Sequence, residues 1–320
     1  MFEFLITRPM GWIIEQIYNL VSNYGLAIIL FTIIIKLILL PLNVKSQKSM
    51  KKQQKIQPFL SELQQKYAND QEKLQREMMK LYKENNVSMM GGCLPMLIQF
   101  PILIGLYRVI QRPITYLAGI GIQQLQEGEF AEKIIMLRDA MADKIGNLAT
   151  ASVELIAKNS QIQLSKWAEI VNGSSDPWAF NFNFLGLDLS NTPSTALGYI
   201  MRMNFSNWGI ILLLIIPILA VIASIATTKI TQMQSGQTNN STTDATNSMT
   251  KSMTLMMPLM TAFFTLTLPA GLGIYWIICS VVQIIQQIVL NYYFDKKGED
   301  IVVTIPEKKQ LHGNKRKKRK

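Results

Sequence analysis

The sequence predicts an all-α polytopic membrane protein, with five transmembrane helices, a cytoplasmic helical hairpin and an N-terminal interfacial helix. Hydrophobic residues make up 49% of the 320 residues and charged residues only 17%, whereas a typical soluble domain is about 25% charged. The apolar residues gather in blocks of about 20, the length that crosses a bilayer. The net charge is +11, and the basic residues cluster between and after these blocks. This pattern excludes an ordinary soluble enzyme.

Four apolar regions contain the five expected spans. The first three spans are expected at 23–42, 91–112 and 208–228. The fourth region is too long for one crossing, and Pro269, Ala270 and Gly271 within it are typical of a turn. We therefore divide this region into spans at 252–268 and 271–292, joined by a tight hairpin.

Basic residues predict the orientation of the spans. The 43–90 segment is dense in Lys and Arg, and the 293–320 tail ends in KRKKRK. The 113–207 segment instead contains more acidic than basic residues. Because loops rich in Lys and Arg remain in the cytoplasm, we expect 43–90 and the tail to be cytoplasmic. The N-terminus and 113–207 are then outside, which agrees with five crossings.

The first segment, 1–22, is expected to be an amphipathic helix on the outer membrane surface. Ile13, Ile17 and Val21 recur at helical spacing in it, and Trp12 suits the headgroup zone. A plain extension of the first span is the alternative. In either case the segment begins the chain with a helix.

The remaining connections have distinct compositions. We expect two helices in 43–90, with a turn at 68–70 and Asp70 as the cap of the second helix. This hairpin is either simply solvated or a docking arm for a partner. We further expect an extracytoplasmic helical subdomain at 113–207 and a cytoplasmic polar linker at 229–251, which is rich in Ser, Thr, Asn and Gln.

Lys36 is the charged residue of the first span. A cation near the bilayer centre costs about 2.5–3.5 kcal/mol on insertion scales, so such residues usually face a bundle interior or water. Thr32 lies one turn earlier on the same face. Lys36 is also only about 9 Å from the inner end of the span, so snorkelling of its stem toward the membrane surface is the alternative.

Polar residues recur in two other spans. Gln99 lies in the second span, between two prolines. A continuous helical stripe in the fifth span consists of Trp276, Ser280, Gln283 and Gln287. Buried amides need partners, so these residues and Lys36 either line a wet cavity or join helices through polar contacts. The wet cavity is favoured because the spans offer Lys36 no acidic partner.

Residues that carry catalytic or metal chemistry are sparse. The sequence contains one histidine, His312, and two cysteines, Cys93 and Cys279. This argues against a His/Cys metal centre and a His-based triad. No Walker, GxSxG or HExxH motif is present. We therefore expect no enzymatic activity, no metal site and no cofactor.

The tail ends in consecutive basic residues. They are Lys315, Arg316, Lys317, Lys318, Arg319 and Lys320. No aromatic residue lies among them, so stacking on nucleic-acid bases is not expected. They can contact RNA phosphates or anionic lipids as a diffuse cation. Alternatively, they act only as a topology signal.

Several stretches resemble the YidC/Oxa/Alb family of membrane protein insertases. They are YGLAIILFTIIIKLILLPLNVKSQKSM, GGCLPMLIQFPILIGLYRVI, FLGLDLS and LPAGLGIYWIICSVVQIIQQ. They span most of the chain in the family's order, apart from about 114–175. The chain is most similar to the shorter members of the Gram-positive type.

The resemblance implies that the protein inserts nascent membrane proteins and helps them fold, through a hydrophilic groove with a positive charge on the first span. Lys36 stands where the family usually carries arginine, and Gln99 and Trp276 match its groove positions. Lysine keeps the charge but loses the planar fork of arginine. The expected groove residues are Thr32, Lys36, Gln99, Trp276, Ser280, Gln283 and Gln287.

The resemblance also implies a location and partners. It places the chain in the bacterial plasma membrane as a multi-pass protein, with the ribosome near the tail and client reception at the 43–90 hairpin. Anionic lipids and the Sec translocon are further candidate partners. The residues alone leave two other classes open: a small-solute channel or transporter, and a lipid scramblase or structural assembly factor. Each would use the same polar cavity.

Overall fold

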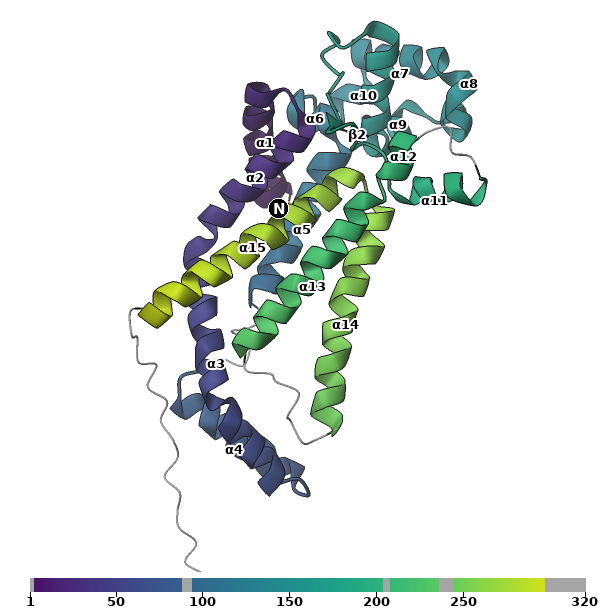
Figure 1. Cartoon of the computed structure of the whole chain (residues 1–320). Helices are drawn as coiled ribbons and strands as arrows, with labels where there is room; N and C mark the ends of the chain where they lie inside the picture. Colours follow the sequence, from purple (N-terminus) through teal and green to yellow (C-terminus); the bar gives the residue numbers. More distant parts are fainter. Residues whose placement is uncertain (1–2, 88–93, 204–207, 236–243, 297–320) are drawn as a thin grey trace, which may run out of the picture.

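The computed structural model describes residues 3–87, 94–203, 208–235 and 244–296 as a mostly helical protein (Figure 1). A short π-helical turn, Glu3–Thr7, leads into the first helix. The long helices are α1 (Arg8–Val21), α2 (Tyr24–Ile38), α3 (Leu40–Lys66), α4 (Gln71–Glu84), α5 (Leu94–Gln111), α13 (Ile215–Ser235), α14 (Asp244–Thr267) and α15 (Ala270–Lys296). They form a helical bundle, from which the pair α3–α4 extends at one end.

Shorter elements gather at the opposite end of the bundle (Figure 1). The helical ones are α6 (Pro113–Leu117), η2 (Gln124–Gln126), α7 (Gly128–Ala140), α8 (Ala142–Ile145), η3 (Gly146–Thr150), α9 (Val153–Asn159), α10 (Gln161–Asn172), α11 (Ser194–Met201) and α12 (Trp208–Leu212). The two strands are β1 (Asn183–Phe184) and β2 (Leu187–Asp188). Residues 113–203, in the range where a helical subdomain is expected, thus form a set of short helices with a small β-hairpin.

Two helical stretches are long and apolar enough to cross a membrane within the described residues. They are Trp208–Met233 and Ala270–Phe294. The bent pair α2–α3 is a third if it counts as one span. The apolar parts Leu97–Gln111 and Met256–Thr267 are shorter. Helix length and composition therefore support two or three of the five expected spans.

The chain bends by 59° between α2 and α3. Leu39 lies at the bend, and Pro41 follows in the first turn of α3. Proline has no N–H group to continue the hydrogen bonding of α2, which explains why α2 ends here. The helix of the first expected span therefore stops at Ile38, and the range 39–42 belongs to the bend and to α3.

Helices α3 and α4 pack against each other through a small apolar core of their own. Its buried members are Ile56, Leu60, Leu81 and Val87. The Asp70 side chain accepts a hydrogen bond from the backbone N–H of Lys73 at 3.0 Å, so the expected cap of the second helix is confirmed. The hairpin is therefore stabilised by the cap at Asp70 and by its apolar core. Its cytoplasmic location remains a prediction.

Helix α15 is the centre of the bundle and packs on α2, α5, α13 and α14. Glycines permit the close approach. A Cβ atom at Gly271 would lie 3.1 Å from Ile28 of α2, and one at Gly273 would overlap Ile216 of α13. Small residues at the start of α15 thus let two neighbouring helices pack against its backbone.

The turn between α14 and α15 is where the sequence predicts it. Helix α14 ends at Thr267 and α15 begins at Ala270. The first N–H groups of a helix have no partner within the helix. Here the N–H groups of Ala270 and Gly271 donate to the carbonyls of Asn191 and Leu189, at 2.9 and 3.2 Å. The segment after β2 therefore caps α15.

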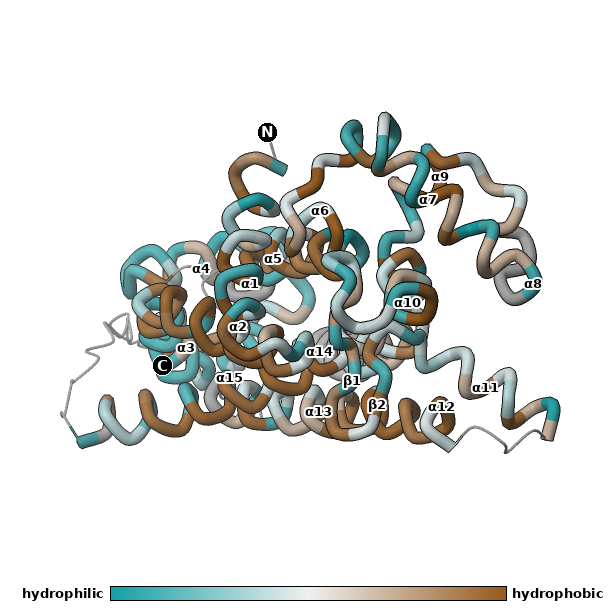
Figure 2. The backbone as a smooth tube through the Cα atoms, turned by 90° about the horizontal axis from the view of Figure 1, so that it is seen from above, coloured by the Kyte–Doolittle hydropathy of each residue, from teal (hydrophilic) through white to brown (hydrophobic). Residues whose placement is uncertain are grey.

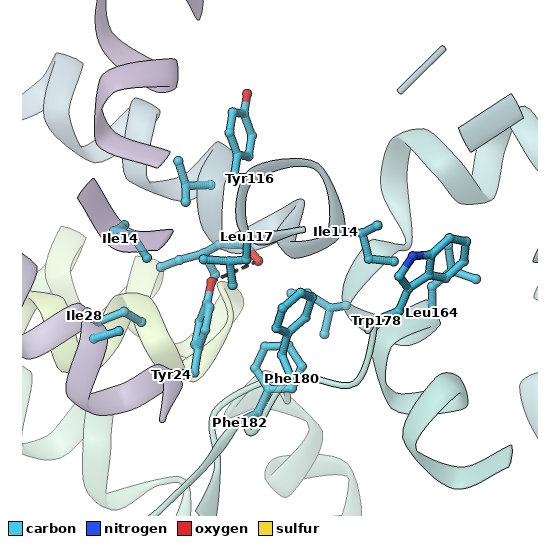
Figure 3. Close-up of a cluster of buried hydrophobic side chains, with 14 of the residues drawn as sticks. Ile14, Tyr24, Ile28, Ile114, Tyr116, Leu117, Leu164, Trp178, Phe180 and Phe182 are labelled. Atoms are coloured by element: carbon cyan, nitrogen blue, oxygen red, sulfur yellow. Dashed lines mark hydrogen bonds between the residues drawn. The ribbon is translucent and has the colours of Figure 1, made fainter. Parts of the chain in front are cut away.

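The short elements share a core with the bundle. Tyr24 of α2 packs edge-on against Phe182 at 4.9 Å between ring centroids, and Tyr18 of α1 packs against Phe180 at 5.5 Å. Figure 3 shows this aromatic group, with Trp178 buried beyond it near α10. Because one continuous apolar cluster joins both parts, the 113–203 region is not an independent unit.

The β-hairpin within this region was not predicted from the sequence. Asn183 pairs with Asp188 and Phe184 with Leu187, in antiparallel register. The two turn residues, Leu185 and Gly186, both have positive φ angles, of 52° and 79°. Such turns match the twist of paired strands, but the leucine conceals the signal because it rarely adopts this conformation.

Asp188 holds the hairpin against its surroundings. Its carboxylate accepts hydrogen bonds from Lys166 of α10, from Ser190 and from the amide of Asn191. Burial opposes ionisation of Asp188, but the bonds from Lys166 and Ser190 outweigh it, so the pKa of the carboxyl lies below its ordinary value. This carboxylate therefore positions the segment that caps α15.

Two expected ranges differ from the elements observed. The polar linker at 229–251 is helical at both ends, because α13 continues to Ser235 and α14 begins at Asp244. Residues 236–243 lie outside the described residues. In 1–22, α1 is amphipathic as expected, but its most buried apolar residues are Met10, Ile14 and Ile17, and they pack against the bundle. Val21 and Ile13 are only partly buried.

Replacing Gly273 by alanine should destabilise the bundle. The added methyl group would overlap Ile216, and overpacking of a core typically costs about 1–3 kcal/mol. Thermal unfolding in detergent should therefore begin several degrees lower. Gly198→Ala is the matched control, because a Cβ atom at Gly198 meets nothing within 4 Å, and its unfolding temperature should be unchanged or higher. Equal unfolding temperatures for Gly273→Ala and the wild type would contradict the close packing.

Asp188→Asn should weaken the pH dependence of stability. The folded-state pKa of Asp188 is depressed, so its carboxylate contributes stability that is present above the unfolded-state pKa of about 4 and is lost as pH falls through the folded-state value. Wild-type unfolding temperatures should therefore drop between about pH 5 and pH 2. The variant should be less stable at pH 7, by about 1 kcal/mol, and should show a flatter profile. Parallel profiles would contradict this role.

Candidate functional site: polar side chains around α15

Lys36 lies on the buried side of α2. Its side chain is 7% exposed, and Thr32 one turn earlier is fully buried. The most exposed residues of this part of α2 are the neighbouring Leu37 and Ile38, at 58% and 60%. Because the lysine stem leaves the helix on its packed side, the structure does not favour a stem that extends along the outer surface of α2 toward the membrane surface. The lysine instead faces other helices, as the sequence predicts.

Among the described residues, the Lys36 ammonium group has no acidic partner, and no oxygen accepts a hydrogen bond from its Nζ atom. The Thr32 hydroxyl is already used, since it donates to the carbonyl of Ile28 at 2.6 Å. Nζ is also not among the fully enclosed polar atoms that lack a partner in the described chain. Because the Nζ atom is not fully enclosed, solvent can reach it, and water can hydrate the charge that no carboxylate pairs.

Gln286 of α15 joins the two sides of the bend next to Lys36. Its Nε2 donates to the carbonyl of Lys36 at 3.1 Å, and its Oε1 accepts from Nδ2 of Asn43 at 3.0 Å. The first bond satisfies a carbonyl in the last turn of α2. Gln286 therefore fixes the backbone of Lys36 relative to both α3 and α15.

Gln99 of α5 also contacts α15. Its Nε2 donates to the hydroxyl of Tyr275 and lies 3.4 Å from the sulfur of Cys279. Tyr275 and Cys279 are buried. Gln99 is thus held between two helices by hydrogen bonds, on the side of α15 that packs on α5.

The predicted stripe of α15 faces a different pair of helices. Trp276 stacks on Phe264 of α14, with ring centroids 6.1 Å apart. The amide of Gln287 donates to the Thr231 hydroxyl of α13 at 3.0 Å. Ser280, between them, is buried and Gln283 is half-buried. The stripe is therefore a real helical face, and its two ends meet α14 and α13.

The expected site residues consequently divide into two groups around α15. Lys36, Thr32 and Gln99 lie toward α2 and α5, where their neighbours on α15 are Tyr275, Cys279 and Gln286. The residues of the predicted stripe lie toward α13 and α14. The sequence did not single out Tyr275, Asn43 or Thr231, whose partners are distant in the chain. The position next to the stripe was the only signal for Gln286.

Basic residues of α3 lie beside the last turns of α15. The ammonium groups of Lys48 and Lys51 are 5.6 and 5.3 Å from the ring centre of Phe294. Lys51 also donates to the carbonyl of Asn291 at 3.4 Å. Three enclosed oxygens on these helices have no hydrogen-bond donor within the part of the chain that the structure describes: Gln47 Oε1, Gln287 Oε1 and Asn291 Oδ1. This end of the bundle is therefore both basic and polar.

A sequence profile described as 60Kd inner membrane protein matches residues 16–297. The chain belongs to this family. The matched range contains every expected groove residue. The basic residues 315–320 lie beyond the match and outside the described residues. Family membership and the apolar helices make the chain a bacterial membrane protein.

Individual relatives of this 60Kd inner membrane protein family member match a shorter stretch. The membrane protein insertase YidC of Clostridium perfringens (strain 13 / Type A) is 52% identical over 105 residues, which are 33% of this chain and 44% of that protein. The protein of the same name from Nitratidesulfovibrio vulgaris (strain DP4) is 50% identical over 105 residues, which are 33% of this chain and 20% of that protein. The match thus covers less than half of each relative.

Among the described residues of this 60Kd inner membrane protein family member, no group of three or more His, Cys, Asp or Glu side chains is arranged to hold a metal ion. The membrane-like helices α2, α5 and α13 contain no acidic residue at all. The polar side chains around α15 can therefore offer hydrogen bonds and, at Lys36, a positive charge.

Gln286→Leu should destabilise the protein in detergent by about 1–3 kcal/mol, because it leaves the Lys36 carbonyl and the Asn43 amide without partners. Scanning fluorimetry measures the shift of the unfolding temperature. Gln283→Leu is the matched control, since the half-buried Gln283 has no hydrogen bond within the described residues, and it should shift the temperature much less. Equal shifts for the two variants would show that Gln286 does not fix the bend.

Proposed function

We propose that the protein is a membrane protein insertase and chaperone. The observation that carries the proposal is Lys36, a buried lysine that has no acidic partner among the described residues and lies on the packed side of an apolar helix. Such a cation is expensive in a membrane and usually has a function. The family match and the relatives named membrane protein insertase YidC support the same activity.

The proposed topology has five spans. They are 23–42, 91–112, 208–228, 252–268 and 271–292, built around α2, α5, α12–α13, α14 and α15. The length of α5 supports the second span: α5 has 18 residues, or about 27 Å at 1.5 Å per residue, close to the thickness of the hydrocarbon core. The distribution of basic residues supports a cytoplasmic hairpin and tail, and an outer N-terminus and 113–207 region.

The proposed substrate path is a hydrophilic groove beside α15 that contains the charge of Lys36. The proposed groove residues are Thr32, Lys36 and Gln99 on the side of α2 and α5, together with Trp276, Ser280, Gln283 and Gln287 on the side of α13 and α14. An acidic or polar segment of a nascent membrane protein is attracted by the ammonium group, and water in the groove shortens its path through hydrocarbon. The flanking apolar segments then move into lipid because their transfer is favourable.

Partners follow from the same proposal. Nascent membrane proteins are the clients, and the 43–90 hairpin receives them. The basic residues 315–320 contact the ribosome or anionic lipids through their charge. The Sec translocon is a further partner in this proposal. No cofactor is needed, because hydrophobic transfer and electrostatic attraction supply the free energy.

Lys36→Ala should slow insertion of a client whose translocated segment is acidic. Loss of the charge removes at least about 1 kcal/mol of attraction in a medium of intermediate dielectric, which corresponds to roughly a fivefold lower rate. Protease protection of the client in liposomes that contain only this protein measures the rate. Lys36→Arg should retain most activity because the charge is kept.

The matched control is the same client with a neutral translocated segment, which should be much less sensitive to Lys36→Ala. Undiminished insertion of the acidic client by Lys36→Ala would reject the role of the charge. Liposomes that pass small solutes or exchange lipids between leaflets, but insert no client, would instead support a channel or a scramblase.

A further inference from the structure

Helix α11 exposes an apolar stripe. Leu197 and Met201, at i and i+4, are 42% and 80% exposed, and Ile200 lies between them on the same face. Ala196, one turn before Ile200, is fully buried, so the exposed stripe is bounded on that side by packed residues. The eight residues of α11 include no charged side chain, so nothing on the helix itself makes this face suitable for water.

The position of α11 relates it to a candidate membrane span. It packs on α12, which begins the apolar stretch Trp208–Met233. Figures 1 and 2 show α11 projecting sideways from α13 and α14 at the level where α12 begins. Trp208 is largely exposed at this level, and tryptophan is enriched where a helix leaves the bilayer.

The base of α11 is anchored to the bundle. Thr195 in its first turn donates to the carbonyl of Thr192 at 2.6 Å. Asn191, one residue earlier, accepts from the N–H of Ala270 and is held by Asp188. The start of α11 is thus fixed relative to the first turn of α15, and its apolar stripe has a defined height on the molecule.

Lipid fits the stripe better than a protein partner does. The stripe covers about one turn, far less than the roughly 1,200 Å² that a stable interface between proteins buries. The neighbouring span also has an exposed apolar face. That face consists of Ile215, Ile218, Leu219 and Ile222. Exposed apolar surface next to a span is typical of contact with a bilayer.

We propose that α11 is an in-plane membrane helix, with Leu197, Ile200 and Met201 inserted at the boundary between headgroups and acyl chains. The leaflet is the one in which α12 begins. The proposal rests on the assignment of α12–α13 as a span and is independent of the insertase activity. In this arrangement α11 sets the depth at which the β-hairpin and the first turn of α15 lie relative to the bilayer.

Fluorescence quenching in liposomes tests the location of the stripe. In a full-length Cys93→Ser, Cys279→Ser background, single cysteines replace Met201, Ile200, Thr195 and Ile218 in separate variants and carry an environment-sensitive dye. The liposomes contain phosphatidylcholine and phosphatidylglycerol, with or without bromine on the acyl chains. Iodide in the water is the second quencher.

The labels at Met201 and Ile200 should be quenched by bromolipid at least about threefold more strongly than the label at Thr195, on the opposite face of α11, and should be protected from iodide. Ile218, exposed in the first turn of α13 and near the middle of the apolar stretch Trp208–Met233, is the positive control for a lipid contact. Iodide quenching at Met201 and Ile200 with normal bromolipid quenching at Ile218 would overturn the proposal for α11 and leave the span intact.

Two other results also decide the question. Protection of Met201 and Ile200 from both quenchers would show that protein covers the stripe, and this would overturn the proposal. Loss of bromolipid quenching at Ile218 as well would reject the span on which the proposal rests. Client insertion is measured on the same liposomes, so a failure of the proposed function is seen separately from either result.

Discussion

The close packing of α15 against two helices at once is the constraint on which the rest of the structure depends. Gly271 lets Ile28 of α2 approach its backbone, and Gly273 does the same for Ile216 of α13. The free N–H groups at its start are satisfied by Leu189 and Asn191. The interhelical hydrogen bonds of Gln99, Gln286 and Gln287 all involve α15. A side chain at either glycine would therefore displace these interactions together.

Lys36 shows how such a bundle can contain a charge without an ion pair. A buried pair would repay part of the desolvation penalty, but it would also hold the ammonium group in one place. Lys36 instead has its backbone fixed by Gln286, while its ammonium group stays available. This arrangement suits attraction of transient acidic partners, because their carboxylates do not have to displace a permanent carboxylate from the ammonium group.

Local signals in the sequence were sufficient for the helices and for some of their ends. Pro269 marks the turn before α15, and Asp70 caps α4 by a bond to a residue three positions away. The hairpin at Leu185 depends on a positive φ angle that leucine does not reveal. Pro41 was a local signal for the bend at Leu39, but the apolar residues on both sides of it were read as one span. The periodicity of Trp276 and Gln287 identified a helical face correctly. It could not tell which helices cover that face. Each neighbouring residue, Tyr275 before Trp276 and Gln286 before Gln287, lies only about 100° away around the helix axis and contacts other helices.

The bonds of Gln286 across the bend have a mechanical consequence. Helix α3 is continuous from Leu40 to Lys66, so a rotation of the α3–α4 arm about Leu39 is transmitted rigidly to Asn43. Such a rotation must either move the Gln286 side chain with it or break the bond between Asn43 and Gln286. The position of the α3–α4 arm and the position of the Lys36 backbone are therefore energetically linked. By reciprocity, a ligand that changes the position of the arm also changes that of the Lys36 backbone, and the converse holds.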